Sequence, residues 1–208
     1  MNRTLLYDSH VALGGRMVDF AGWELPVQYP TGPLEEHKRV REAAGLFDID
    51  HMGQVVVAGP EALRFLQMIQ VNDISTMAVS DARYSLMCYA DGAVIDDIFL
   101  YRVAAESWWV IVNASNRKKD VEWMQLHAVG LNVSVTDISD ETYMLALQGP
   151  QAQTILQRLT DVDLATVKFH TCAQATVNGV ATLLGATGYT GEYGYELFFP
   201  AAHATAMW

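Results

Sequence analysis

The stretch from Gln54 to Gln70 reads QVVVAGPEALRFLQMIQ, and its hydrophobic period changes in the middle. The run Gln54 to Ala58 is short and β-branched, which is typical of a strand. Gly-Pro then opens EALRFLQMIQ, in which Leu63, Leu66 and Ile69 recur near the spacing of one helix face. The stretch therefore predicts a strand followed directly by a helix, and the fold is read outward from it.

The chain after this stretch continues the same unit. Tyr84 to Tyr89 and Ala93 to Val103 are strand-like runs joined by Ala-Asp-Gly, a typical hairpin turn. Trp108 to Val112 (WWVIV) predicts another strand, Ser115 is expected to cap the helix that follows, and Asn132 to Thr136 predicts a last strand. The order β-α-β-β-β-α-β predicts a ferredoxin-like split βαβ unit with one extra strand.

The flanking segments do not fit inside this unit. Before it, a charged helix is expected from Glu35 to Ala44, with Gly45 as its stop. After it, a strand is expected from Tyr143 to Leu147 and a helix from Gln151 to Leu159. These segments predict a second mixed domain built from both ends of the chain.

The predicted fold class is therefore α+β. A ferredoxin-like domain, residues 53–137, is inserted into a second α+β domain formed by residues 1–52 and 138–208. The segment from Pro200 to Trp208 looks like the opening of an amphipathic helix without a polar finish, so the chain is expected to stop short of a natural terminus.

The composition limits the class of protein. The chain has 208 residues, of which 51% are hydrophobic, and it can bury a core. A formal net charge of -11 disfavours nucleic acid and anionic membrane surfaces as partners. A secretory signal and a long apolar run are not found, which favours a cytoplasmic protein with no membrane partner. Cys88 and Cys172 are expected to be reduced core residues, and no metal-ligand spacing is found, so no metal is expected.

Asp96 and Asp97 lie within an apolar strand-like run. Because side chains alternate across a strand, the two carboxylates should face opposite sides, and one should point into a core or cleft. A buried carboxylate must be paired or directed at a ligand. The alternative is an edge strand whose Asp is exposed to water. Tyr101 is expected to share the face of Asp97.

Two further features are candidates for ligand contacts. The segment GATGYTGEYGYE, Gly185 to Glu196, combines glycines that permit close backbone approach with tyrosines suited to a planar heterocycle, although an ordinary glycine-rich hairpin is the alternative. It carries no phosphate-loop lysine. Asn113 follows the WWVIV strand, and its amide can both donate and accept hydrogen bonds. Helix capping explains Ser115 or Asn116 but not Asn113.

Six phrases in order carry a resemblance to a known family. They are MVDFAGWELPVQYP, GLFDIDHMG, AVIDDIFLYRV, IVNASNRKKD, ALQGPQA and ATGYTGEYGYE. Together they resemble aminomethyltransferase, the T-protein of the glycine cleavage system. The resemblance implies a folate-binding fold, tetrahydrofolate as cosubstrate, and the lipoylated H-protein as partner and aminomethyl donor. The implied products are ammonia and 5,10-methylenetetrahydrofolate.

The resemblance also implies roles for individual residues. Asp97 is similar to the family's key acid beside the folate, and it is the expected catalytic residue. The other implied folate contacts are Met52, Tyr84, Tyr101, Asn113, Tyr189 and Glu196. Glu196 is expected to accept hydrogen bonds from the donor edge of the pterin. Asp97 and Glu196 are expected to meet on one heterocycle from separate lobes.

The chain differs from this family in length, because the C-terminal β-barrel lobe is missing. We therefore expect this chain to be weakly active or inactive on its own. Two alternatives stay open: a non-catalytic folate-binding module, such as an iron–sulfur assembly factor of the same fold, and the folate lobe of a dimethylglycine- or sarcosine-oxidising enzyme.

Overall fold

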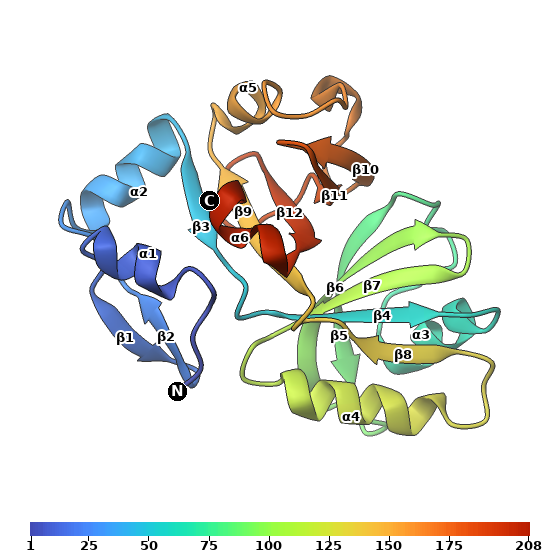
Figure 1. Cartoon of the computed structure of the whole chain (residues 1–208). Coiled ribbons are helices and arrows are strands. Elements are labelled where there is room, and N and C mark those ends of the chain that lie inside the picture. The colour runs from blue at the N-terminus through green and yellow to red at the C-terminus, as the bar shows by residue number, and fades with distance from the viewer. The chain divides into compact units, whose positions relative to one another are not determined.

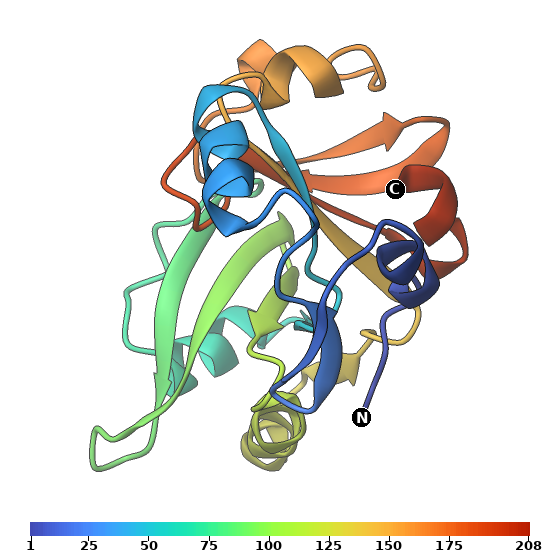
Figure 2. The same ribbon diagram turned by 90° about the vertical axis from the view of Figure 1, so that its left-hand side faces the viewer.

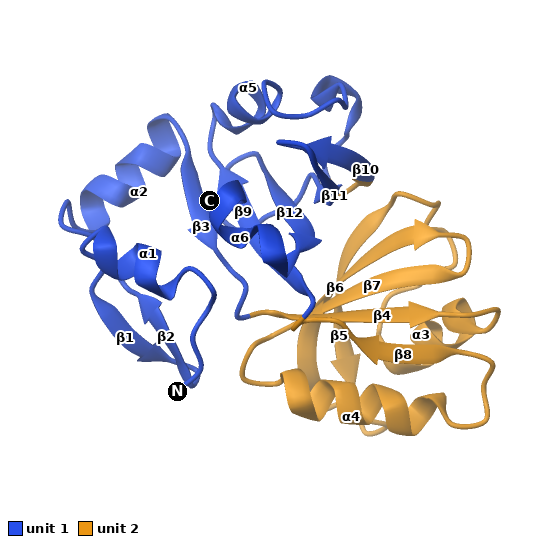
Figure 3. Ribbon diagram, in the orientation of Figure 1, with its two compact units in different colours: residues 1–51, 141–169, 173–208 blue, residues 52–140, 170–172 orange.

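The stretch that begins at Gln54 folds as predicted, into β4 (Gly53–Ala58) and α3 (Ala62–Ile69). The structure is a computed structural model that describes residues 1–208. Its contacts divide the chain into unit 1, residues 1–51, 141–169 and 173–208, and unit 2, residues 52–140 and 170–172 (Figure 3). Each unit has a five-stranded sheet, its own helices and its own buried cluster, which confirms the α+β class.

Unit 2 has the predicted order of elements. After β4 and α3 come β5 (Ala82–Cys88), β6 (Val94–Ala104), β7 (Ser107–Val112), α4 (Arg117–Ala128) and β8 (Ser134–Asp137). The sheet order is β5-β6-β7-β4-β8 and all pairs are antiparallel. The four strands β6, β7, β4 and β8 have the ferredoxin-like arrangement, and β5 is the extra strand at the edge. Figure 2 shows the turn of the β5–β6 hairpin reaching past the rest of this sheet.

The core of unit 2 lies between one face of its sheet and the two helices. Val55 and Val57 alternate along β4 toward this core, as the pleat requires. They pack with Phe65, Trp108 and Met124, all of which are fully buried and come from α3, β7 and α4, the elements labelled in Figure 1. The opposite face of the sheet is therefore the one that can carry a site.

The predicted cap of α4 is wrong. The helix begins after Asn116 rather than after Ser115, and no side chain caps it. The Asn116 side chain is engaged elsewhere, because its Nδ2 donates to Asp96 Oδ1 at 2.6 Å and its Oδ1 accepts from Lys119 Nζ at 3.1 Å. The Asn116 side chain thus bonds to the neighbouring strand β6 and to the Lys119 side chain instead of capping a backbone N–H of its own helix.

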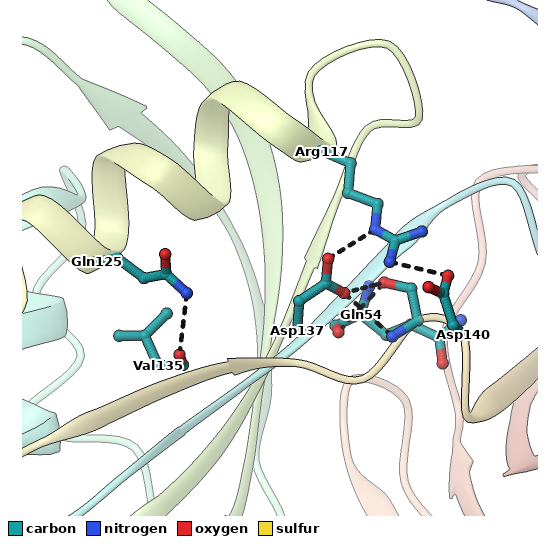
Figure 4. A network of polar contacts seen from close by, with 7 residues as sticks. Gln54, Arg117, Gln125, Val135, Asp137 and Asp140 are labelled. Carbon is teal, nitrogen blue, oxygen red and sulfur yellow. Dashed lines mark hydrogen bonds and ion pairs between the residues drawn. The ribbon is translucent and has the colours of Figure 1, made fainter.

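A polar network joins the two ends of the chain segment that forms most of unit 2 (Figure 4). Gln54 N, near the start, donates to Ser139 Oγ at 2.8 Å, and Ser139 Oγ donates to Asp137 Oδ1 at 2.6 Å. Arg117 at the start of α4 donates to Asp137 Oδ2 at 2.8 Å and to Asp140 Oδ1 at 3.0 Å. These hydrogen bonds therefore hold the start of β4 next to the end of β8, the two points at which the chain begins and ends this segment of unit 2.

Unit 1 is built on a sheet of order β10-β11-β12-β9-β3. Its strands are β3 (Gly45–Asp48), β9 (Thr142–Gln148), β10 (Cys172–Val177), β11 (Val180–Gly185) and β12 (Gly194–Pro200). A separate hairpin pairs β1 (Met17–Phe20) with β2 (Trp23–Pro26). The helices are α1 (Tyr7–Ala12), α2 (Pro33–Glu42), α5 (Ala152–Leu156) and α6 (Ala204–Met207). No helix has the length and apolar character needed to span a bilayer.

Two helix boundaries in unit 1 differ from the prediction. Helix α2 ends at Glu42, and Gly45 begins β3 instead of acting as a stop. A Cβ at Gly45 would lie 2.7 Å from Val40 Cγ2, so this glycine serves the close packing of α2 on β3. Helix α5 ends at Leu156, short of the predicted Leu159, because the chain then turns into a short bridge between Thr160 and Val177.

Candidate functional site

Asp97 lies on the face of the unit 2 sheet that is opposite to the helices, and its side chain is exposed. Asn113 leaves the end of the neighbouring strand β7 and turns its amide toward this carboxylate. Asn113 Nδ2 donates to Asp97 Oδ1 at 2.8 Å and lies 3.1 Å from the Asp97 backbone oxygen. Two residues that the sequence analysis singled out separately are thus joined by a direct hydrogen bond.

Aromatic side chains lie beside this carboxylate on the same face. Tyr84 on β5 lies directly opposite Phe99 of β6, which makes it a diagonal cross-strand neighbour of Asp97. The Tyr84 side chain is 50% exposed. Reduced hydration, then the charge of Asp97 and a hydrogen bond to it, raise the pKa of the Tyr84 hydroxyl. Tyr101 is fully buried, and its ring centroid is 5.2 Å from that of Phe99. On this face the exposed acid therefore lies beside the exposed ring of Tyr84, whereas the ring of Tyr101 has no exposed surface.

Asp96 faces the other way and is 5% exposed. It accepts hydrogen bonds from Asn113 N at 2.9 Å, Asn113 Nδ2 at 3.0 Å and Asn116 Nδ2 at 2.6 Å. Burial by itself would raise the pKa of Asp96, but the hydrogen bonds from Asp120, Asn113 and Asn116 outweigh it and hold the pKa below its ordinary value. The two adjacent carboxylates therefore differ: Asp96 is buried and paired, and Asp97 is exposed toward the open face.

Asp120 is a member of this cluster that the sequence analysis missed. It lies in the first turn of α4, is fully buried, and receives no hydrogen bond from any N–H group. Burial, then its hydrogen bond to Asp96 and the charge of Asp96, raise the pKa of Asp120 to about 8. The available signal was the acid that closes IVNASNRKKD, next to the apolar Val121, a position where a solvated Asp is not expected.

The remaining predicted site residues come from other segments of the chain. Met52 is half-buried and immediately precedes β4 in unit 2, whereas Tyr189 and Glu196 belong to unit 1. Glu196 on β12 is 7% exposed and accepts a hydrogen bond from Thr187 Oγ1 at 2.5 Å. Tyr189 is 76% exposed. The expectation that Asp97 and Glu196 meet on one ligand stays a prediction.

The glycine-rich segment between β11 and β12 encloses the side chain of Gln148, which is 1% exposed. Gln148 Nε2 donates to Thr187 O at 3.0 Å, and Gln148 Oε1 accepts from Thr190 Oγ1 at 2.9 Å. A Cβ at either Gly188 or Gly194 would lie 2.5 Å from Gln148 Cδ. Part of the glycine density is therefore explained by the close packing of the segment on Gln148, the last residue of β9.

Unit 1 also contains a cavity of about 670 Å³. Of the predicted site residues, only Tyr189 lines it, together with apolar side chains such as Phe20 and the polar groups of His10, Asp48 and His51. Asp48 Oδ2 accepts from Thr4 Oγ1 at 2.6 Å and lies 2.9 Å from His10 Nε2. The polar groups around Asp48 in this wall are thus hydrogen-bonded, whereas His51 Nδ1 is buried without a hydrogen-bond partner.

Metal ligands and the two cysteines are the remaining candidates for chemistry, and of the cysteines only Cys172 is buried, whereas Cys88, predicted to be a core residue, is half-buried. No group of three or more His, Cys, Asp and Glu side chains is placed to hold a metal ion. Cys172 is buried, and burial, then the charge of Asp81, raises the pKa of its thiol to about 12. It is therefore a thiol, not a thiolate, at neutral pH.

Comparisons with known proteins agree with the six sequence phrases. The chain is 48% identical to the aminomethyltransferase of Herpetosiphon aurantiacus and 46% identical to that of Desulfitobacterium hafniense, over 208 residues in each case. Both alignments cover 100% of this chain and 57% of the relative, so the chain spans little more than half the length of these relatives.

Solved structures show the same fold. The glycine cleavage system aminomethyltransferase T of Bartonella henselae matches with a TM-score of 0.92 at 32% identity, covering 99% of this chain and 55% of that one. A chain of heterotetrameric sarcosine oxidase from a Corynebacterium species matches with a TM-score of 0.64 at 12% identity, covering 99% of this chain and 90% of that one. The second match shows the fold alone. The model of the GCVT N-terminal domain matches residues 6–208, and the chain therefore belongs to that family, as its sequence phrases indicated.

Proposed function

We propose that this chain supplies the folate-binding part of a glycine cleavage aminomethyltransferase. The proposed reaction takes the aminomethyl group from lipoylated H-protein, releases ammonia and forms 5,10-methylenetetrahydrofolate. The family membership and the similarity to proteins named aminomethyltransferase support this proposal. A cytoplasmic location belongs to the same proposal.

The observation that carries the proposal is the Asp97 carboxylate, which is exposed and held by Asn113 beside Tyr84. A reduced pterin presents N–H groups on a flat ring, and a fixed carboxylate can accept from them while aromatic faces pack on the ring. The residues of unit 2 thus fit this substrate without any metal ligand.

The proposed role of Asp97 follows from its charge. A positive charge develops on the methylene carbon as ammonia leaves, and a carboxylate held in advance stabilises it without reorganising. The same carboxylate orients the folate N5 toward that carbon. Because Asn113 already uses its amide to hold Asp97, the acid needs no further ordering when substrate binds.

Binding and turnover test the proposal separately. Tetrahydrofolate is titrated into this chain by calorimetry, and ammonia release is assayed with aminomethylated, lipoylated H-protein. The full-length relative from Herpetosiphon aurantiacus serves as the positive control. We expect saturable folate binding by this chain and ammonia release that is much weaker than that of the control.

Two outcomes would redirect the proposal. If the chain does not bind tetrahydrofolate while the control does, the Asp97 face is not sufficient for folate recognition. If the chain binds folate as tightly as the control but releases no ammonia with H-protein, the non-catalytic folate-binding module replaces the transferase.

A further inference from the structure

Two acids are buried behind the strand that carries Asp97. Asp96 lies on that strand, β6, and Asp120 lies on α4. Asp120 lies among the apolar residues of the unit 2 core, with Val121 and Met124 on the same helix. A charged carboxylate at such a position needs several donors, but neither oxygen of Asp120 receives one from an N–H group. A neutral, protonated Asp120 avoids the free-energy cost of a buried charge without hydrogen-bond donors.

The neighbours of Asp120 decide which acid holds the proton. Asp96 already accepts from the Asn113 and Asn116 side chains and from the Asn113 backbone, so Asp96 is the carboxylate of the pair. Asp120 is then the hydrogen-bond donor to Asp96. The charged groups that act on Asp120 are Asp96 on β6 and Lys119 on its own helix, whose Nζ lies 3.9 Å from Asp120 Oδ1.

We propose that Asp120 is a positioning residue for Asp97. It holds a proton at neutral pH and donates a hydrogen bond to Asp96, which in turn holds the Asn113 amide. That amide joins the two faces of the strand, since its Nδ2 lies 3.0 Å from Asp96 Oδ1 and 2.8 Å from Asp97 Oδ1. The assignment of a role in catalysis to this chain of contacts rests on the proposed function of Asp97.

Loss of the proton would change the cluster. Two adjacent carboxylates would then share a water-excluded space with only Lys119 nearby, and their repulsion would move Asp96 away from Asn113. The raised pKa of Asp120, about 8, places this change at mildly alkaline pH. The Asp97 site is therefore expected to lose its order as the pH rises through that value.

Three variants separate positioning from general stability. Asp120→Ala removes the donor, Asp120→Asn keeps a donor but cannot titrate, and Glu122→Gln changes an exposed acid on the same helix as a control. In the full chain, carboxyl ¹³C resonances report the protonation of Asp120, and the Asn113 side-chain amide resonances report its position. We expect Asp120 to titrate near pH 8, and the Asn113 resonances to shift in Asp120→Ala but not in Asp120→Asn.

Folate affinity gives the functional readout. By calorimetry at pH 7, Asp120→Ala should bind tetrahydrofolate about tenfold more weakly, the equivalent of one lost charge-assisted hydrogen bond, while Asp120→Asn and Glu122→Gln stay close to the wild-type value. Affinity of the wild type should fall as the pH rises above about 8, and this fall should be absent in Asp120→Asn.

The inference and the proposed function fail in different ways. An ordinary acidic titration of Asp120, or Asn113 resonances that do not move in Asp120→Ala, would overturn the inference even if folate binds normally. If the wild type does not bind tetrahydrofolate, the proposed function fails, and the Asn113 resonances still decide whether Asp120 positions the cluster.

Discussion

At the scale of single residues, the first prediction concerns the negative charge of the exposed Asp97. Asp97→Asn keeps an oxygen that can accept from Asn113, so the strand should fold normally, but it removes the negative charge. We expect turnover to fall by about two to three orders of magnitude, the usual effect of losing one charge-stabilising group. Turnover is measured as ammonia release with aminomethylated, lipoylated H-protein.

The matched control is Asp91→Asn, at the turn between β5 and β6. Its carboxylate accepts only from the nearby Ala93 N, at 3.0 Å, which an amide oxygen can also do. Circular dichroism should show no change in either variant. Near-normal turnover in Asp97→Asn would remove this acid from the mechanism.

A second prediction concerns Glu196. If this acid reads the pterin, Glu196→Ala should weaken tetrahydrofolate binding by about tenfold or more, because a charge-assisted hydrogen bond is lost. Glu192→Ala, which removes a nearby carboxylate paired with Arg41 at 2.9 Å, is the control. Calorimetry measures both, and Glu196→Gln keeps the bond with Thr187 in case the alanine variant unfolds. Equal affinity in wild type and both Glu196 variants would contradict the assignment.

The protonated Asp120 has a consequence for stability. Its folded pKa, about 8, lies above its ordinary value of 3.8, so between these values the folded state binds a proton that the unfolded state lacks. The free energy of unfolding contributed by Asp120 is full below pH 4 and falls as the pH rises toward 8, by at most about 1.4 kcal/mol per pH unit.

Urea denaturation of the wild type and Asp120→Asn between pH 5 and 8 measures this contribution. The difference between the two curves isolates Asp120, because His51, whose pKa is lowered by burial and which acts in the opposite direction, is present in both. The difference should shrink steadily as the pH rises. Parallel curves would show that Asp120 is charged in the folded protein.

The residue scale also shows what a sequence can predict of a site. The alternation of side chains along a strand correctly predicted that Asp96 and Asp97 point to opposite faces of the sheet, because this alternation depends only on the local backbone. It could not show that Asn113 bonds to both acids, since this contact depends on the register of β6 against β7. Asp120 was missed for the same reason: its partner is 24 positions away in the sequence.

At the scale of elements, the packing of the segment between β11 and β12 requires glycine, because a side chain there would collide with Gln148. Gly188→Ala would place a Cβ against the buried Gln148 amide, and we expect a loss of about 1–3 kcal/mol in the free energy of unfolding, the usual cost of overpacking. Denaturant unfolding measures it. In a double-mutant cycle, adding Gln148→Ala should recover part of the loss, and strictly additive losses would show that the clash is not the cause.

Prediction was strongest for elements with a clear hydrophobic period and weakest at their ends. The runs that form β4, α3 and β7 each bury one set of apolar residues in the same cluster, so pattern and structure agree, although Trp109 and Ile111 of β7 lie outside it. The cap of α4 could not be foreseen, because Asn116 bonds to a distant strand in preference to its own helix. The strand β3 was missed, because its edge position gives only four half-buried residues and no alternation.

At the scale of the whole molecule, each unit has its own core. Phe65→Ala, in the core of unit 2, should lower the free energy of unfolding of that unit by about 3–5 kcal/mol through the cavity it leaves. Hydrogen exchange should then speed up in residues 52–140 and much less in unit 1. Leu145→Ala, buried in the core of unit 1, should give the reverse pattern. A uniform increase across the chain in both variants would mean that the units unfold together.

The pairing of strands at the boundary between the units has a practical consequence. Strands β3 and β9, which end and resume unit 1 around the intervening segment, are hydrogen-bonded neighbours, and so are β4 and β8, which open and close most of unit 2. The two chain segments that connect the units therefore start and end on neighbouring strands in each unit. A protein engineer who exchanges residues 52–140 for another βαβ module keeps the β3–β9 pairing of the host sheet but removes the backbone partners of residues 170–172, because Ala82 N donates to His170 O and Cys172 N donates to Ser80 O.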